Sequence, residues 1–402
     1  MPSLIVFSHL RWNFVQARPQ HLLARLAAHY PVLYVEEPLY GPGVARLEHA
    51  SPAEGIEVLR PRTPLALEGF RDEQIALMKP LLLQYLAQRQ LDDYLCWFYA
   101  PMAQPLLAAL SPRAVVYDCM EEWSARSDAT PELEQRERRL LQVAGLVLAG
   151  GPSLYAAKQK LNPHVLCLPS AVDAEHFAPQ KALTDSAAVQ RAEQLHARIG
   201  RPRLGFFGII DQRVDTALVG KLADAEPEWE IVMVGPVQDV DPLMLPYRRN
   251  IHWLGRQPYE LLPQLVAQWD ACLLPYVLND GTRFLSPTKT LEYLAAEKPV
   301  ISTAVQDVLA MYGEVVHIGG DASSFVEACQ SALSETGHKH AERLSNMVAM
   351  VSRFSWDRTA QVIDAALQDL LGPPLAGGDD AAQPEGVEPV QGAPPSLAGA
   401  QG

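Results

Sequence analysis

Residues 286–303 read SPTKTLEYLAAEKPVIST, a helical pattern that runs directly into a short apolar strand pattern. Ser286 followed by Pro287 predicts the start of the helix, because a serine hydroxyl can cap a free backbone N–H and proline suits the first helical position. The strand pattern at 299–303 is apolar throughout, which is typical of a strand inside a parallel sheet. This helix–strand unit indicates an α/β fold.

The predicted helix carries a lysine where a cation is unfavourable. Lys289 lies in the first turn, at the positive end of the helix dipole. Glu292 does not compensate well, since lysine N-terminal to glutamate is the weaker orientation for a helical ion pair. Two explanations remain. Either a bound anion such as phosphate offsets the charge, or Lys289 is a solvated surface lysine that costs on the order of a few tenths of a kcal/mol.

The same alternation of strands and helices occurs in two halves of the chain. Short apolar runs in the first half lie at 3–8, 31–36, 94–99, 114–118, 145–150 and 164–169, and in the second half at 203–208, 230–235, 250–255, 271–276, 299–303 and 314–318. Helical patterns lie between them, including 18–29, 131–143, a mostly helical 64–90 and a final helix at 356–371. We therefore expect two doubly wound, Rossmann-like parallel-sheet domains that face each other across a cleft.

The domain boundaries follow from these patterns. We expect an N-terminal domain, a connector, a C-terminal domain, a C-terminal helix that packs back on the N-terminal domain, and a tail, over residues 1–178, 179–200, 201–354, 355–372 and 373–402. The tail is rich in proline, glycine and alanine and has no strong apolar pattern, which predicts disorder.

Composition limits the partners and the compartment. The net charge of −14 and the absence of a basic run argue against a nucleic-acid partner. Five widely spaced cysteines without a C-x-x-C pair fit a reduced cytoplasm. We expect no signal peptide and no membrane-spanning helix. Peripheral association with the inner face of the membrane stays open.

Glycines end three of the first four strands of the second half, at Gly208, Gly235 and Gly255. Ligands of open α/β sheets bind beyond the carboxyl ends of the strands, where glycine lets a ligand approach the backbone. An easy exit from a strand into a turn would also explain any one of them.

Cations gather near the same predicted edge. Arg213 follows the Gly208 strand, and Arg283 precedes the helix that carries Lys289. With the backbone amides of Ser286–Thr288, these side chains would bind a diphosphate, which arginine grips bidentately and lysine as a point charge. If the diphosphate belongs to a nucleotide, Glu292, one turn into the helix, would accept hydrogen bonds from its ribose. The base of that nucleotide would lie near Gly255 and Arg256.

Several familiar sites are missing from the sequence. It has no Walker phosphate loop, no G-x-G-x-x-G after the first strand, no H-E-x-x-H and no nucleophile elbow. Asp239-Val240-Asp241 has the D-x-D form of some metal-dependent sugar transferases. It follows Gly235 by several residues and precedes Pro242, which favours a loop over a metal ligand pair. We expect no metal and no cofactor.

Candidate acid–base groups end the strands of the first half. Asp118 ends one strand, and Glu121 and Glu122 follow in the same loop. In an inverting reaction a carboxylate here would act as the general base, whereas a retaining reaction needs none. His9 ends the first strand and is a second candidate. Arg18 and Gln20 are expected to border the cleft on the side of the N-terminal domain, where the molecule that accepts a transferred group would bind.

The chain resembles the group 1 glycosyltransferases, which have the two-Rossmann GT-B architecture. The resemblance rests on residues 250–303 and on GFFGIIDQRVD, EWEIVMVGP, FSHLRWNFVQARPQHLLARLA, AVVYDCMEE and PSAVDAEHF. It implies a nucleotide-diphosphate sugar as donor and Glu292 as the ribose ligand. S-P-T-K-x-x-E-Y resembles a branch found in polysaccharide and teichuronic-acid-type gene sets. Phe284 stands where many retaining members have a sugar-binding glutamate, and Glu297 stands where glycine is usual.

These features predict a metal-independent glycosyltransferase of hexosyltransferase type. It would transfer a sugar to a glycan or lipid-linked saccharide acceptor in the synthesis of a cell-surface polysaccharide. Two other functions remain open. The same fold would suit a nucleotide-sugar 2-epimerase, and the missing glutamate at Phe284 would suit a non-catalytic subunit that binds nucleotide sugars or carbohydrate.

Overall fold

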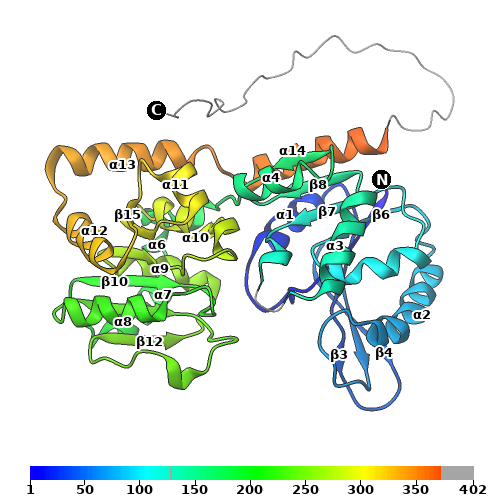
Figure 1. Cartoon of the computed structure of the whole chain (residues 1–402), viewed down its shortest axis with the longest axis horizontal. Helices are drawn as coiled ribbons and strands as arrows, with labels where there is room; N and C mark the ends of the chain where they lie inside the picture. Colours follow the sequence, from blue (N-terminus) through cyan, green and yellow to red (C-terminus); the bar gives the residue numbers. More distant parts are fainter. Residues whose placement is uncertain (127–128, 373–402) are drawn as a thin grey trace, which may run out of the picture.

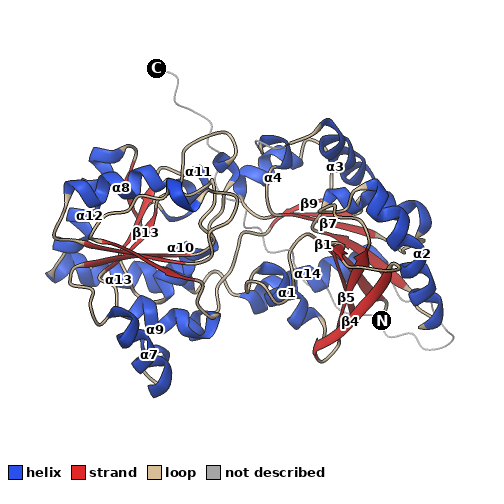
Figure 2. Cartoon of the chain, turned by 90° about the horizontal axis from the view of Figure 1, so that it is seen from below, coloured by secondary structure: helices blue, strands red, loops and turns tan. Residues whose placement is uncertain are grey.

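The computed structural model describes residues 1–126 and 129–372, so the predicted tail 373–402 lies outside the described residues. The described chain forms two α/β units that lie side by side (Figure 1). Figure 2 shows each sheet with helices on both of its faces. The two-sheet α/β architecture expected from the sequence is confirmed.

The first unit is built on a sheet of nine strands, all parallel except one. Its spatial order is β3-β5-β2-β1-β6-β7-β8-β9, with β4 antiparallel on β5. The strands are β1 (Ser3–Ser8), β2 (Val32–Glu36), β3 (Leu39–Tyr40), β4 (Arg46–Ala53), β5 (Ile56–Thr63), β6 (Tyr94–Phe98), β7 (Val115–Cys119), β8 (Leu146–Ala149) and β9 (Val165–Cys167).

The helices of this unit are α1 (Arg18–Leu26), α2 (Asp72–Gln88), η1 (Pro101–Ala109), η2 (Trp123–Ala125), α3 (Pro131–Val143) and α4 (Pro152–Lys158). The predicted helical segment 64–90 is correct only from Asp72 onward. The hairpin β4–β5 was not predicted. Most of β4 is exposed and its sequence, RLEHASPA, lacks alternation of apolar and polar residues, so the usual strand signal is absent.

The second unit has a sheet of six parallel strands in the order β12-β11-β10-β13-β14-β15. They are β10 (Arg203–Phe207), β11 (Glu230–Val234), β12 (Ile251–Gly255), β13 (Ala271–Leu274), β14 (Val300–Thr303) and β15 (His317–Gly319). Each lies within or next to an apolar run of the sequence, because strands buried on both faces need apolar side chains on both.

The helices around the second sheet begin before it. The predicted connector holds short helices, and residues from Val172 onward pack into the core of the second unit. The helices are α5 (Ala174–Phe177), α6 (Pro179–Ala182), α7 (Ser186–His196), α8 (Thr216–Ala225), η3 (Pro242–Met244), η4 (Tyr259–Leu261), α9 (Leu262–Ala267), η5 (Thr282–Phe284), α10 (Thr288–Ala295), α11 (Gln306–Tyr312), α12 (Ala322–Ser334) and α13 (Gly337–Val351).

The last described helix, α14 (Trp356–Leu371), belongs to the core of the first unit. Its buried residues Trp356, Ile363 and Leu367 share an apolar cluster with Leu4 of β1 and with α1. The ring of His21 in α1 stacks on that of Trp356 at 4.9 Å between centroids. In Figure 1 this orange helix lies along the first unit. The chain therefore crosses between the units a second time.

Both sheets have a point where the strand order reverses. It falls between β1 and β6 in the first sheet and between β10 and β13 in the second. Ligands of doubly wound sheets bind beyond the carboxyl ends of the strands at such points. His9 follows β1, and Gly208 follows β10, so two of the predicted residues lie at these points.

A buried contact and a partly buried one join the units. Asp307 of α11 accepts hydrogen bonds from the backbone N of Ser153 (3.1 Å) and from its Oγ (3.0 Å), so it caps α4 of the other unit. Thr288 Oγ1 donates to Ser170 Oγ at 3.0 Å. A Cβ on Gly151 would lie 2.2 Å from Oδ2 of Asp307, so the loop before α4 approaches too closely for any side chain there.

Replacing Asp307 with alanine should lower the free energy of unfolding by about 1–2 kcal/mol, since it removes a helix cap. It should also increase the radius of gyration in small-angle scattering, because a contact between the units is lost. Asp321→Ala is the matched control, since Asp321 caps α12 within its own unit. Equal radii for the two variants would show that Asp307 does not hold the units together.

Candidate functional site

Two glycines form a close backbone contact at the carboxyl edge of the second sheet. Gly208 and Gly235 have φ angles of +143° and +146°. The N–H of Gly208 donates to the carbonyl of Val234 at 2.8 Å, and that of Gly235 donates to the carbonyl of Gly255 at 2.9 Å. A Cβ on Gly235 would lie 1.7 Å from the carbonyl oxygen of Gly208. Only glycine fits here, and the edge stays open for a ligand.

Lys289 lies directly over this edge. A Cβ on Gly208 would be 2.0 Å from Cε of Lys289 and 2.8 Å from its Nζ. The side chain is half-buried, and within residues 1–126 and 129–372 its ammonium group has no hydrogen bond or ion pair. A half-buried cation without such a partner is costly unless a ligand neutralises it. Of the two explanations that the sequence left open, this favours a bound anion over a solvated surface lysine.

The start of α10 adds free donors beside this ammonium group. The capping residue is Pro287, which has no side-chain cap, so the prediction of Ser286 as the cap is wrong by one position. In the part of the chain that the structure describes, the N–H groups of Thr288 and Lys289 have no acceptor. Free amides, the helix dipole and Lys289 together can hold a phosphate or diphosphate.

Glu292 lies one turn further into α10. Glu292 is 8% exposed, and within the described ranges its carboxyl group makes no hydrogen bond and no ion pair. Burial raises the pKa of Glu292 to about 7, while the charge of Lys289 lowers it. An unpaired buried carboxyl group is costly unless a ligand satisfies it. Hydroxyl groups of a bound sugar would do so.

His9 and Glu121 face this edge from the first unit. Burial lowers the pKa of His9, and Glu121 opposes this shift, whereas Arg126 and Arg213 add to it. Arg213 belongs to the second unit, so its effect on His9 shows that the carboxyl edges of the two sheets are close. His9 is therefore neutral at pH 7. Its ring meets Trp123 edge-on at 5.2 Å, and its Nδ1 is buried without a partner among the described residues.

Arg213 is held in place by an acidic neighbour. Its Nε donates to Oδ1 of Asp211 at 3.1 Å and its Nη2 to Oδ2 at 2.5 Å. Its charge also interacts with that of Glu121. The third guanidinium nitrogen, Nη1, has no hydrogen bond in the described part of the chain, so it can still donate to an anion.

Residues 201–335 match the family model described as glycosyl transferases group 1. This part of the chain is a group 1 glycosyltransferase domain. TuaH of Bacillus subtilis (strain 168), named as a teichuronic acid biosynthesis glycosyltransferase, is 26% identical over 295 residues. That match covers 68% of this chain and 72% of TuaH. The resemblance inferred from the sequence is confirmed, and the chain is a glycosyltransferase.

Solved structures agree on the fold. Sucrose-phosphate synthase from Thermosynechococcus elongatus has a TM-score of 0.69 at 16% identity, covering 92% of this chain and 99% of that one. HepE of Anabaena, solved with UDP and glucose, has a TM-score of 0.68 at 14% identity, covering 91% of this chain and 99% of that one. At such identities the likeness shows the GT-B fold alone, which confirms the predicted fold class.

Asp118 and Arg18 of this glycosyltransferase pair with each other. Asp118 is fully buried, and Nε of Arg18 lies 3.1 Å and 3.2 Å from its two carboxylate oxygens. Arg18 also donates to the carbonyl of Leu168 at 2.8 Å. Burial raises the pKa of Asp118, and Arg18 lowers it. A carboxylate enclosed in this way cannot reach an acceptor, so the structure contradicts the predicted base role of Asp118 and the cleft position of Arg18.

Gln20 and Glu122 also have structural partners. Gln20 is buried, and its Nε2 donates to the carbonyl of Trp12 at 2.9 Å, which fixes the loop before α1. Glu122 accepts from Nζ of Lys158 at 2.7 Å, and the same ammonium donates to Glu137 at 2.8 Å. Both side chains are engaged within the first unit, so neither suits the acceptor role expected from the sequence.

Arg283 and its neighbour lie away from the glycine edge. Arg283 is exposed, and its Nε donates to Gln306 at 3.2 Å. The next residue, Phe284, packs against the apolar core of the first unit. In the described chain no contact links Arg283 with Lys289 or Arg213, so the structure gives no support to its diphosphate role. Phe284, which stands where the sequence lacks a sugar-binding glutamate, therefore packs the second unit against the first.

Ser286 and Thr288 bridge the two units. Ser286 lies against Gly151 of the first unit, and the hydroxyl of Thr288 is bonded to Ser170. The side chains of Ser286 and Thr288 therefore lie between the units, and within the described residues the backbone amides of Ser286 and Thr288, which the sequence predicted as diphosphate ligands, have no acceptor. Binding at this helix and contact between the units share one segment.

Arg256 also crosses between the units. Its guanidinium donates to the carbonyl of Phe14 and lies over the Phe14 ring at 4.9 Å. This occupied side chain is poorly placed to bind a base. Gly255 has φ +64°, and a Cβ added to it would have nothing within 4 Å, so backbone space remains open there for a ligand group.

Asp239 and Asp241 lie in a loop, as the sequence favoured. Asp241 accepts from the backbone N of Leu243 at 2.9 Å and caps η3. Within residues 1–126 and 129–372 no group of three or more His, Cys, Asp or Glu side chains is placed to hold a metal ion.

Three further residues near the site, Asp211, Arg126 and Glu37, were not predicted from the sequence. Asp211 orients Arg213, and the charge of Arg126 acts on His9. Glu37 directly follows β2, so its position after an apolar strand was a usable signal.

Proposed function

We propose that this glycosyltransferase transfers a sugar from a nucleotide-diphosphate sugar to a glycan or lipid-linked saccharide, in the synthesis of a cell-surface polysaccharide. The observation that carries the proposal is the unpaired ammonium of Lys289 over Gly208, with the unpaired carboxyl group of Glu292 one turn away, both as found among the described residues. A diphosphate and a ribose would satisfy these two groups together. The name of TuaH and the UDP bound to HepE support this choice of acceptor and donor.

The chain's own groups would stabilise the departing diphosphate. Lys289, the free Nη1 of Arg213 and the amides at the start of α10 are fixed before the reaction, which is electrostatic preorganisation. They supply positive charge where the leaving group gains negative charge. The proposal therefore includes no metal and no cofactor.

Glu121 is the best placed of the predicted carboxylates on the acceptor side. Its side chain is 30% exposed, pairs with Nη1 of Arg126 at 3.5 Å through one oxygen, Oε2, and lies near both His9 and Arg213. In an inverting transfer its carboxylate would take the proton of the acceptor hydroxyl, as a general base. In a retaining transfer it would only orient that hydroxyl. His9, neutral at pH 7, would hydrogen-bond the sugar.

The proposed reaction takes place in the cytoplasm, and a lipid-linked acceptor would bring the protein to the inner face of the membrane. No described helix has the length and apolar character needed to span a bilayer. Vesicle flotation with and without the acceptor lipid tests the peripheral association.

A panel of UDP-, GDP- and dTDP-sugars tests the function. We expect release of nucleotide diphosphate from one donor, faster with an acceptor, and a rate that stays within about twofold when EDTA removes divalent metals. The expectation follows because fixed cations can replace a metal at a diphosphate. Loss of the rate with EDTA would contradict the metal-free mechanism. Epimer formation without an acceptor, or binding without turnover, would contradict the transferase.

A further inference from the structure

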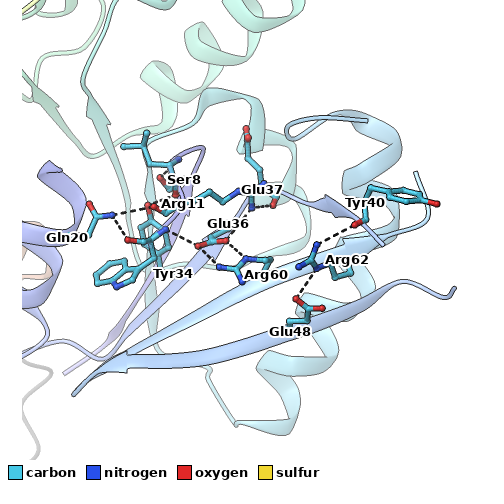
Figure 3. Close-up of polar contacts among 12 residues, drawn as sticks. Ser8, Arg11, Gln20, Tyr34, Glu36, Glu37, Tyr40, Glu48, Arg60 and Arg62 are labelled. Carbon is cyan, nitrogen blue, oxygen red and sulfur yellow. Dashed lines mark hydrogen bonds and ion pairs between the residues drawn. The ribbon is translucent and has the colours of Figure 1, made fainter. Parts of the chain in front are cut away.

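Glu36, the last residue of β2, and Glu37, which follows the strand, have different surroundings (Figure 3). Glu36 is fully buried and accepts from Nε and Nη2 of Arg60 at 2.6 Å and 3.2 Å, and from Nη1 of Arg11 at 3.3 Å. It also accepts from the backbone N of Trp12 at 2.9 Å. Both of its oxygens are engaged, so Glu36 has a structural role.

Glu37 has no such partners. Within residues 1–126 and 129–372 its carboxylate makes no hydrogen bond and no ion pair, although the side chain is half-buried. Its backbone carbonyl accepts from Arg11, which fixes the turn after β2. In Figure 3 the Glu37 side chain points away from the pair of Glu36 and Arg60. The backbone of the turn is therefore fixed, while the carboxylate oxygens have no hydrogen-bond partner among the described residues.

Gly69 keeps the space beside this carboxylate open. A Cβ on Gly69 would lie 3.4 Å from Oε1 of Glu37, and the φ of Gly69 is +77°, a conformation that favours glycine. No side chain of this loop residue covers Glu37.

The position of Glu37 places it at the proposed transfer site. The parallel register pairs Ser8 of β1 with Glu36 of β2, so the next residues along the two strands are His9 and Glu37. The charge of Arg126 acts on both His9 and Glu37. Glu37 therefore lies beside the strand-order reversal at β1, on the same edge as His9 and Glu121.

We propose that the Glu37 carboxylate binds a hydroxyl group of the acceptor saccharide and so orients the acceptor toward the donor in the other unit. A carboxylate with two free oxygens is a pure acceptor, and sugar hydroxyls are its natural donors. The inference rests on the proposed transferase function and adds to it the residue that selects the acceptor.

Ionisation of Glu37 falls in the physiological range. Burial and the charge of Glu68 raise its pKa, Arg11 and Arg126 lower it, and the result is about 7. Since only the ionised carboxylate accepts at both oxygens, acceptor binding should strengthen as the pH rises from 6 to 8. Glu36 is paired with Arg60, and burial lowers the pKa of His9, which favours its neutral form.

The test compares E37Q with the wild type in transfer to p-nitrophenyl glycosides. The acceptor is the glycoside on which the wild type is most active among glucoside, galactoside, N-acetylglucosaminide and glucuronide. We expect E37Q to raise the acceptor KM about 10- to 100-fold, the range for a lost hydrogen bond to a charged group. The donor KM should stay within about twofold. Glu48→Gln is the matched control, because Glu48 pairs with Arg62 on the hairpin.

The pH dependence separates a binding role from a structural one. The acceptor KM of the wild type should fall between pH 6 and 8, and that of E37Q should be flat. Glu68→Gln should move the wild-type transition to lower pH, because it removes a charge that raises the pKa of Glu37. An unchanged acceptor KM in E37Q, or an equal rise in donor KM, would overturn the role of Glu37. Failure of the wild type to transfer to any glycoside would instead contradict the proposed function.

Discussion

Replacing Lys289 with alanine should lower kcat for sugar transfer by about 10²–10³-fold, the usual loss when one preorganised group that stabilises a leaving charge is removed. The reason is its position, with Nζ over the backbone of Gly208 and no partner within the described residues. The fold should be unaffected, since no ion pair is broken. Steady-state kinetics with the preferred donor, together with thermal unfolding, measure both effects.

Lys221→Ala is the matched control for this experiment. Lys221 is an exposed lysine on α8, a helix of the same unit. Its loss removes the same charge from the surface without touching the glycine edge, so kcat should stay within about twofold. If K289A behaved like this control, Lys289 would be the solvated surface lysine that the sequence left as one explanation.

Replacing Glu292 with glutamine should weaken donor binding and raise the free energy of unfolding. The donor KM should rise about 10- to 100-fold, because the ribose loses a charged hydrogen-bond acceptor. The donor KM of the wild type should fall as the pH rises through about 7, where Glu292 ionises, and that of E292Q should be flat.

The stability of E292Q follows from the same pKa. The folded-state pKa of about 7 lies above the ordinary 4.5, so the folded protein binds the proton more tightly than the unfolded chain. Protonation of Glu292 therefore stabilises the folded protein fully below pH 4.5, and this contribution to the free energy of unfolding is lost as the pH rises through 7. At about 1.36 kcal/mol per pKa unit this loss is roughly 3 kcal/mol. Denaturation at pH 8 should show E292Q to be more stable than the wild type, with the difference vanishing near pH 4.

A purely structural Glu292 would give another result. If its carboxyl group served the fold, E292Q would be less stable than the wild type at pH 8, and donor binding would change only through misfolding. Higher stability combined with weaker donor binding is typical of a residue kept for a ligand at a cost to the fold.

The sequence was sufficient for the parts of the site that depend on local patterns. The glycine at the end of β10 and the lysine at the start of α10 could be placed because strand ends and helix starts have signals within a few residues. The hairpin β4–β5 lacked such a signal, since most of β4 is exposed.

Pairing between distant charges was beyond the sequence. Asp118 and Glu121 looked equivalent as carboxylates after an apolar strand. Asp118 is buried against an arginine 100 residues away, whereas Glu121 pairs with nearby Arg126 and stays partly exposed near the other unit. Glu37 was missed for the same reason, because its free carboxylate differs from paired Glu36 only through tertiary contacts within the described chain. Which of several charges is free for a ligand depends on the folded neighbours of each.

We propose that a nucleotide diphosphate binds at Lys289 and Glu292. A crystal structure with whichever of UDP, GDP and dTDP binds most tightly tests it directly. We predict diphosphate oxygens within hydrogen-bond distance of Lys289 Nζ and the Thr288 and Lys289 amides, and ribose hydroxyls on the Glu292 carboxylate. A nucleotide bound elsewhere, or one whose ribose points away from Glu292, would contradict this binding mode.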